Sequence, residues 1–268
     1  MRPRGIVITG ATGGIGRALV RAYAAPGVRL LLFGRDEAAL DAARREAEAA
    51  GAVATTRAVP VTDHAAMADA LRAFDAEAGI DLFLAAAGVK TGNRDGLEPP
   101  DQLDRVIAVN LTAVLHQVQA VLPGMLSRGS GQIALFGSLA AASPVADLLS
   151  YTATKAGITG YGVALRRAVR GTGVTVHVIS PGFVDTPMTH RHGGPTPMVM
   201  SADRAARIIR TGLARGRPHI SFPRLLFLLV WLENLLPAAL GDRIDRAYRA
   251  EITPDPDEDA ARRDQSRG

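Results

Sequence analysis

Short apolar runs alternate with longer Ala-rich segments along most of this chain, and this alternation is the strongest constraint on its fold. We predict strands at the apolar runs, residues 5–10, 28–35, 52–61, 80–88, 131–138, 173–182 and 218–222. The segments between them have helical period, which predicts helices at 16–25, 36–51, 63–79, 99–127, 151–171 and 201–216. Because a strand–helix–strand crossover makes neighbouring strands parallel, we expect an α/β fold with a doubly wound parallel sheet between two helical layers.

No repeat or linker divides the alternating region, so we predict one domain over residues 1–222. A hydrophobic helical extension is expected at 223–252. The tail at 253–268 is charged and has no apolar period, which predicts disorder. With 47% hydrophobic residues in a chain of 268, a sizeable core can be buried.

Composition excludes several classes of protein. The chain has no cysteine, which rules out disulfides, thiolate metal sites and cysteine nucleophiles. The formal net charge of +5 comes almost entirely from Arg scattered through Ala-rich helices, so we do not expect nucleic-acid binding; phosphate-bearing ligands and an anionic membrane surface stay open. His190 and His192 have no obvious acidic partner, so no metal site is predicted. The N-terminus has no signal-peptide pattern, and we expect a cytoplasmic protein.

A glycine-rich turn, TGATGGIGRA (9–18), joins the first predicted strand to the first predicted helix. Gly10, Gly14 and Gly16 are spaced for a tight turn that lets a pyrophosphate approach the backbone at the N-terminus of a helix. A Walker A loop is excluded because no Gly-Lys-Ser/Thr sequence follows. The turn therefore predicts a dinucleotide site.

The end of the second predicted strand bears on which dinucleotide is bound. Gly34 occupies the position where a carboxylate would hold the ribose hydroxyls of NAD, and Arg35 follows it. An arginine there can pair with a 2′-phosphate, so NADP(H) is favoured over NAD(H). Two alternatives stay open: Arg35 as a solvated residue at a helix start, and an influence of the adjacent Asp36.

Tyr151 and Lys155 lie four residues apart, which places them on one face of a helix. This Arg-rich chain contains only two lysines, and Lys155 is one of them. A phenol with a pKa near 10 is a poor acid or base at neutral pH, and a nearby ammonium lowers that pKa. The pair is therefore a candidate for proton transfer.

Together these motifs resemble the short-chain dehydrogenase/reductase family. The resemblance rests on TGxxxGxG at 9–16, Tyr-xxx-Lys at 151–155, Ser138 thirteen residues before Tyr151, and Asn110 in VIAVNLTAV; it spans roughly residues 4–190. It implies a Rossmann-type, three-layer fold and an oxidoreductase that interconverts a ketone and a secondary alcohol by hydride transfer with NADP(H).

The resemblance also implies roles for the matched residues. Tyr151 would be the general acid in reduction and the general base in oxidation. Ser138 would hydrogen-bond the substrate oxygen where charge develops. Lys155 would lower the Tyr151 pKa and bind the nicotinamide ribose. Asn110 would hold a water that links Lys155 to solvent.

The same resemblance implies the cofactor-binding residues, including the Pro-Gly loop SPGFVDTPM (180–188) around the nicotinamide. They are Gly10, Thr12, Gly13, Gly14, Ile15, Gly16, Arg35, Val61, Ala87, Gly88, Tyr151, Lys155, Pro181, Gly182, Val184 and Thr186.

Two departures from the family pattern affect the expected cofactor contacts. AAAG (85–88) replaces Asn-Asn-Ala-Gly, which removes side-chain hydrogen bonds to neighbouring strands but keeps the backbone approach at Ala87 and Gly88. Pro60 replaces the Asp that often contacts adenine, so Val61 is expected to contribute backbone contacts only.

The segment FPRLLFLLVWLENLLPAALGDRI (222–244) departs from the compact ending of the family. Its residues 225–232 are wholly apolar and Pro237 ends the run, which is shorter than the roughly 20 residues of a transmembrane helix. Three interpretations stay open: an interfacial membrane helix, a wall of an apolar substrate pocket, or a subunit contact. Some relatives that act on sterols or long-chain lipids have similar endings, so we expect a lipophilic substrate.

The main alternative function is an NADP-binding redox-sensing or membrane-surface scaffold protein without turnover. Such proteins typically lose the Tyr or the Lys, and this chain has both. A sugar-nucleotide epimerase or dehydratase would need a larger C-terminal substrate domain. Since the family usually pairs through helices that correspond to 99–127 and 151–171, a homodimer or homotetramer is expected.

Overall fold

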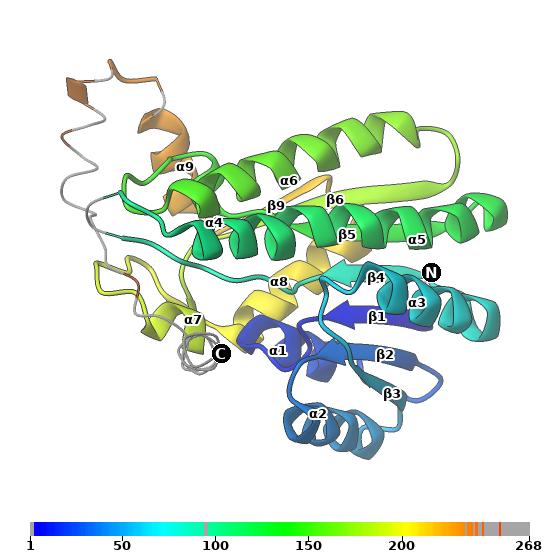
Figure 1. Ribbon diagram of the computed structural model, residues 1–268. Coiled ribbons are helices and arrows are strands. Elements are labelled where there is room, and N and C mark those ends of the chain that lie inside the picture. The colour runs from blue at the N-terminus through cyan, green and yellow to red at the C-terminus, as the bar shows by residue number, and fades with distance from the viewer. Residues whose placement is uncertain are drawn as a thin grey trace.

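A seven-stranded sheet, with every strand parallel to its neighbours, forms the centre of the molecule (Figure 1). The structure is a computed structural model that describes residues 3–93, 96–233, 235–237, 239–240, 243 and 252. In sheet order the strands are β3 (Val53–Ala58), β2 (Arg29–Gly34), β1 (Gly5–Thr9), β4 (Leu82–Ala85), β5 (Gly131–Phe136), β6 (Val174–Pro181) and β9 (His219–Phe222). The predicted parallel sheet is confirmed.

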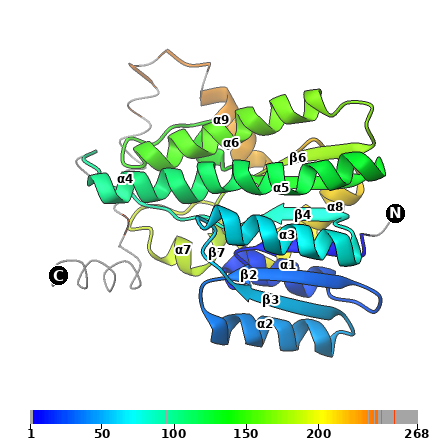
Figure 2. The ribbon, with the colours of Figure 1, turned by 45° about the vertical axis from the view of Figure 1, so that its right-hand side comes forward.

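Helices cover both faces of this sheet, as Figures 1 and 2 show. They are α1 (Gly14–Tyr23), α2 (Glu37–Ala49), α3 (His64–Ala78), α4 (Pro100–Ile107), α5 (Ala113–Arg128), α6 (Leu149–Ala168), α7 (Pro187–His190), α8 (Ala202–Ala214) and α9 (Arg224–Glu233). Apolar side chains of α1, α2 and α8 form one core with the sheet, and those of α3, α5 and α6 form the other. The three-layer Rossmann-type fold expected from the sequence is therefore confirmed.

Side-chain caps determine where several helices begin. The Asp36 carboxylate accepts a hydrogen bond from the Ala39 amide at 3.1 Å, and Asp63 accepts one from Ala66 at 3.0 Å. Both satisfy amides that the first helical turn leaves unpaired. The Asp63 cap fixes the start of α3 at His64.

The predicted helix at 99–127 has an irregularity that its sequence pattern does not reveal. A π-helical turn at Ala108–Thr112 connects α4 to α5, so that one helix runs from Pro100 to Arg128. By length and composition this helix could cross a membrane, a test that buried core helices also pass. Here its inward face, including Val118 and Val121, packs in the core against the sheet.

The sheet order reverses between β1 and β4, which lie side by side although β2 and β3 separate them in the chain. In doubly wound sheets the ligand crevice lies at such a switch point, outside the carboxyl ends of the strands. The turn after β1 and the loops after β4, β5 and β6 all begin at this edge. A second, two-stranded sheet of β7 (Val184–Asp185) and β8 (Met200–Ser201) follows β6 in the chain.

The end of the described chain is only partly helical. The extension predicted at 223–252 contains α9, described residues up to 243, and Ile252, which is buried. Many large apolar side chains of α9 are exposed, among them Trp231 at 52%. The division at 222/223 stays a prediction, and the disorder predicted for 253–268 concerns residues outside the described part.

Two glycine-to-alanine changes should have opposite effects on stability. A Cβ at Gly16 would lie 1.9 Å from the Gly10 carbonyl oxygen, whereas a Cβ at Gly160, inside α6, would meet nothing within 4 Å. Gly16→Ala should lower the free energy of unfolding by about 2 kcal/mol or more, and Gly160→Ala should raise it by roughly 0.5–1 kcal/mol. Urea denaturation monitored by circular dichroism measures both, and equal effects would contradict the packing of the glycine turn.

Candidate active site

The glycine turn lies between two other loops of the site. Gly10 has a positive φ of 67°, and a Cβ there would lie 2.8 Å from the Cα of Ala87, in the loop after β4. A Cβ at Gly14 would lie 2.3 Å from Cγ2 of Thr186, in the loop after β6. Only glycine combines this backbone conformation and these approaches, so the spacing predicted from the sequence has a packing reason.

The N-terminus of α1 is open to a ligand. Its N-cap is Gly13, which has no side chain to cap the first-turn amides, including those of Gly14 and Ile15. Amides at such a position favour phosphate groups. Thr12 packs against Gly34, where a Cβ would lie 2.9 Å from its Cγ2. The side chain of Thr12 therefore explains why residue 34 is a glycine rather than a carboxylate.

Arg35 begins the exposed segment after β2, and the structure answers the question about its neighbour. The carboxylate of Asp36 caps α2, so it is already engaged by the Ala39 amide. Val61 is half-buried in the turn between β3 and α3. This arrangement leaves Arg35 as the charged side chain closest in sequence to the end of β2.

Asn110 lies in the π-helical turn, only 1% exposed, and contacts the loop after β4. Its Nδ2 donates to the Val89 carbonyl and its Oδ1 accepts from the Val89 amide, both at 2.8 Å. The Thr9 hydroxyl accepts from the Ala87 amide at 3.2 Å. Asn110 and Thr9 thus hold the loop that AAAG cannot hold with its own side chains. The water relay through Asn110 stays a prediction.

Tyr151 and Lys155 lie on the buried face of α6, at 9% and 6% exposure. The Lys155 ammonium is 5.7 Å from the centroid of the Tyr151 ring and donates to the Phe136 carbonyl, at the end of β5, at 3.0 Å. A Cβ at Gly88 would lie 3.2 Å from Oδ1 of Asn110 and 3.5 Å from the same nitrogen, so the loop after β4 runs directly beside the ammonium. The i, i+4 spacing places both groups where the sequence predicted.

Burial shifts the pKa values of both side chains. It lowers the pKa of Lys155 to about 8 and raises the pKa of Tyr151, a rise that the Ser138 hydroxyl partly opposes. The sequence led us to expect that Lys155 would lower the Tyr151 pKa. In this structure desolvation of the phenolate dominates, so the Tyr151 hydroxyl is neutral at pH 7.

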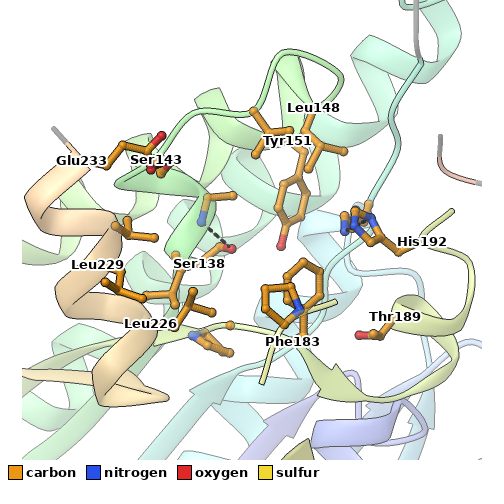
Figure 3. A pocket seen from close by; sticks show the side chains of 18 of the residues that line it. Ser138, Ser143, Leu148, Tyr151, Phe183, Thr189, His192, Leu226, Leu229 and Glu233 are labelled. Atoms are coloured by element: carbon orange, nitrogen blue, oxygen red, sulfur yellow. Dashed lines mark hydrogen bonds between the residues drawn. The ribbon is translucent and has the colours of Figure 1, made fainter. Parts of the chain in front are cut away.

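Ser138 is positioned as a hydrogen-bond donor. It follows β5, and its Oγ accepts from the Ala140 amide at 3.1 Å, which leaves its own proton for another acceptor. Figure 3 shows the hydroxyls of Ser138 and Tyr151 directed toward each other in one cavity. Two donors that converge in this way suit an oxygen that gains negative charge.

The Pro-Gly loop at the end of β6 lies beside Ser138 and Tyr151, where Pro181 and Gly182 line the same cavity. The Gly182 amide donates to the Phe222 carbonyl at 2.7 Å, next to Pro181 at the end of β6. Val184 is buried, and the Thr186 hydroxyl donates to the Val184 carbonyl and caps α7. The structure therefore brings the expected Pro-Gly residues to the same edge as the glycine turn.

A cavity of about 400 Å³ opens beside Tyr151 and Ser138 (Figure 3). Most of its lining is apolar, and α9 forms one wall. A Cβ at Gly182 would lie 3.1 Å from Leu226, and the Ser143 hydroxyl donates to the Glu233 carboxylate at 2.8 Å. The α9 residues that line the cavity, with those just after it, are Leu226, Leu229, Val230, Leu232, Glu233 and Leu236. Of the three interpretations of the apolar segment, this supports the pocket wall.

Several lining residues were not identified from the sequence. Lys90 donates to Nδ1 of His192 at 3.1 Å, and its ammonium is 5.6 Å from the centroid of the Phe183 ring. All three line the cavity, as do Ser143 and Glu233. The one sequence signal was that Lys90 is the other lysine of an Arg-rich chain.

The expectation that the loop histidines lack an acidic partner is wrong for His190. Its Nε2 lies 2.6 Å from the Asp185 carboxylate. Within the ranges that the structure describes, however, no cluster of three His, Asp or Glu residues could hold a metal ion. The two residues form an exposed contact between the end of α7 and β7, and His192 lines the cavity instead.

A model of the short chain dehydrogenase family matches residues 4–194 of the chain. The chain belongs to the short-chain dehydrogenase family. Relatives of this family include an uncharacterized oxidoreductase of Myxococcus xanthus, 36% identical over 93% of this chain and 99% of that protein. The 3-oxoacyl-[acyl-carrier-protein] reductase FabG of Salmonella typhimurium is 32% identical over 68% of this chain and 74% of that protein.

Solved structures of other short-chain dehydrogenases are similar to the whole fold. One from Sphingobium yanoikuyae in complex with NADPH has a TM-score of 0.75, 26% identity, and coverage of 91% of this chain and 93% of that one. A metagenomic short-chain oxidoreductase in complex with NADP has a TM-score of 0.68, 31% identity, and coverage of 78% and 89%. The family resemblance inferred from the motifs is confirmed.

His192 should make the protein less stable in acid. Burial and the nearby Lys90 charge lower its pKa from 6.5 to about 4, although a backbone hydrogen bond with Pro195 opposes this shift. The unfolded chain then binds the proton more readily, so stability should fall as the pH drops from 6.5 to about 4. His192→Asn should lose less thermal stability across this range than wild type. His190→Asn serves as the control, and identical pH profiles for all three proteins would contradict the burial of His192.

Proposed function

We propose that this short-chain dehydrogenase interconverts a lipophilic ketone and the corresponding secondary alcohol, with NADP(H) as cofactor. One observation carries the proposal: Tyr151 and Ser138 converge on an apolar cavity at the switch-point edge of the sheet, with the Lys155 ammonium behind the tyrosine. Each group has a defined part in the reaction.

In the direction of reduction, Tyr151 donates its hydroxyl proton to the ketone oxygen, and Ser138 donates a hydrogen bond to the same oxygen. The phenolate that remains is stabilised by the ammonium of Lys155, which has donors left beyond its bond to the Phe136 carbonyl. In oxidation, the phenolate takes the proton from the alcohol. Asn110 supports this arrangement by holding Val89 and, through it, the backbone beside Lys155.

The residues around the glycine turn fit a dinucleotide, which would supply or accept the hydride. The open N-terminus of α1 fits the pyrophosphate, and the lack of a side chain at Gly14 lets Thr186 lie directly against the glycine turn. Arg35 provides a charge for a 2′-phosphate. The similar structures in complex with NADPH and NADP support the choice of NADP(H) over NAD(H).

The apolar lining of the cavity supports a lipophilic substrate, because transfer of apolar surface from water favours binding by about 25 cal/mol per Å². The main alternative, a protein that binds NADP without turnover, is not favoured by the intact Tyr, Lys and Ser. A cytoplasmic location, peripheral membrane contact through 222–244 and a homodimer or homotetramer stay predictions from the sequence.

Replacement of Tyr151 by Phe should abolish turnover. The change removes the transferred proton but keeps the ring, so kcat with NADPH and the best ketone of a chain-length series should fall at least about 100-fold. Tyr161→Phe, in the same helix, is the control and should change kcat by less than about threefold. NADPH oxidation followed by absorbance measures both. Unchanged turnover in the Tyr151 variant would overturn the proposed mechanism, and NADPH binding with no turnover of any ketone would favour the alternative function.

Replacement of Arg35 by Ala should weaken NADPH selectively. Loss of a charge-assisted contact to a 2′-phosphate should raise the KM for NADPH roughly 10–100-fold and leave the KM for NADH nearly unchanged. Arg45→Ala is the control, since Arg45 is exposed and pairs with Asp41 at 2.7 Å on α2. If the KM values for both cofactors rise equally, Arg35 does not read the 2′-phosphate.

A further inference from the structure

The cavity beside Tyr151 has two polar ends, and this division bears on the substrate. Figure 3 places His192 on one side of Tyr151 and Ser138, and Glu233 on the other, beside the leucines of α9. Lys90 forms a hydrogen bond with His192 at one end, and Ser143 forms one with Glu233 at the other. The proposed reaction uses none of these four residues.

Lys90 is a half-buried cation without an anionic partner in the described part of the chain. Its contacts are the His192 ring nitrogen at 3.1 Å and the face of Phe183. Because an ammonium can only donate, Nδ1 of His192 accepts and Nε2 carries the ring proton. Burial keeps His192 neutral at pH 7, with a pKa of about 4. The pair therefore bears one net positive charge next to an apolar cavity.

A buried charge of this kind is costly unless an opposite charge joins it. Apart from Lys90 and Lys155, the basic side chains that carry a fixed positive charge are Arg, and many of them pair with carboxylates on the surface, as in Arg17–Glu46 and Arg44–Glu48. Lys90 differs in both respects: it is a lysine, and no carboxylate of the described residues pairs with it. Burial lowers its pKa to about 8, which still leaves the ammonium protonated at pH 7.

At the far end, the Glu233 carboxylate repels a second negative charge. An anionic group is therefore attracted at the Lys90 end and disfavoured at the α9 end, where Leu226 and Leu229 offer apolar surface. Tyr151 and Ser138 lie between the two ends. A molecule oriented in this way would present a carbonyl at an inner carbon, with an acid group on one side and an alkyl chain on the other.

We propose that Lys90, supported by His192, binds the carboxylate of an oxo acid whose alkyl chain lies along α9. This inference rests on the proposed function and defines its substrate class. Ile252 helps to hold the anion site together: its amide donates to the Gly92 carbonyl at 3.3 Å, and it pairs with His192 in a β-bridge. The loops that carry Lys90 and His192 are thereby linked.

The test uses 2-oxo-, 4-oxo- and 5-oxodecanoate, the methyl ester of each, and 4-decanone, with NADPH and the full-length protein. For at least one acid, kcat/KM should exceed that of its ester by about tenfold or more. Lys90→Met should remove this preference, while Lys90→Arg should retain part of it. In 9-oxodecanoate the carbonyl has only a methyl group on one side, so its long chain would place the carboxylate at the α9 end. This acid should react more slowly than the preferred acid. Equal values for acids and esters, or a preference that survives in Lys90→Met, would overturn the proposal.

A binding measurement separates this proposal from the proposed function. Calorimetric titration of decanoate and decanol needs no turnover; decanoate should bind wild type more tightly than decanol, and Lys90→Met should abolish the difference. The melting temperature of Lys90→Met should equal or exceed that of wild type, since the change removes a buried charge. Lys90-dependent binding without turnover of any ketone would overturn the proposed function alone. Turnover of neutral ketones without acid preference would overturn the acid site alone.

Discussion

The close approach of the turn after β1 to the loop after β4 is the contact on which the site depends. Gly10 and Ala87 meet backbone to backbone, and any side chain at position 10 would separate them. Parallel pairing of β1 with β4 brings these loops together, and Asn110 and Thr9 then hold the second loop by its amides and carbonyls. The positions of the glycine turn, the Lys155 ammonium and the Pro-Gly loop all depend on this contact.

Burial then determines what the polar groups can do. Tyr151 and Lys155 are removed from water, which favours the neutral form of each: the phenol holds its proton more tightly and the ammonium holds its proton less tightly. A phenol of this kind is neutral at pH 7, and in the proposed reaction the charge that develops on it would lie close to the Lys155 ammonium in a medium of low dielectric constant. Electrostatic stabilisation is stronger there than in water.

Local patterns in the sequence predicted much of the site because its cofactor half consists of short, contiguous segments. Gly10 to Gly16 form one turn, and Tyr151 and Lys155 are neighbours on one helix face, so their spacing implies their geometry. Other features had no local signature. The π-helical turn that contains Asn110 was not predicted from the pattern of 99–127, and the packing of Thr12 against Gly34 joins two different loops.

The sequence by itself determined the parallel α/β fold through its periodicity. Its motifs indicated the family, and with it Tyr151, Lys155, Ser138 and the glycines, because these residues recur at fixed spacings along the chain. Only the tertiary structure decided which residues line the cavity beside Tyr151. Lys90 and His192 are about one hundred residues apart in the chain, and Ser143 and Glu233 are separated almost as far, yet each pair makes a direct hydrogen bond. Such contacts depend on how loops from different strands fold over one sheet edge, and no local pattern of residues encodes that meeting.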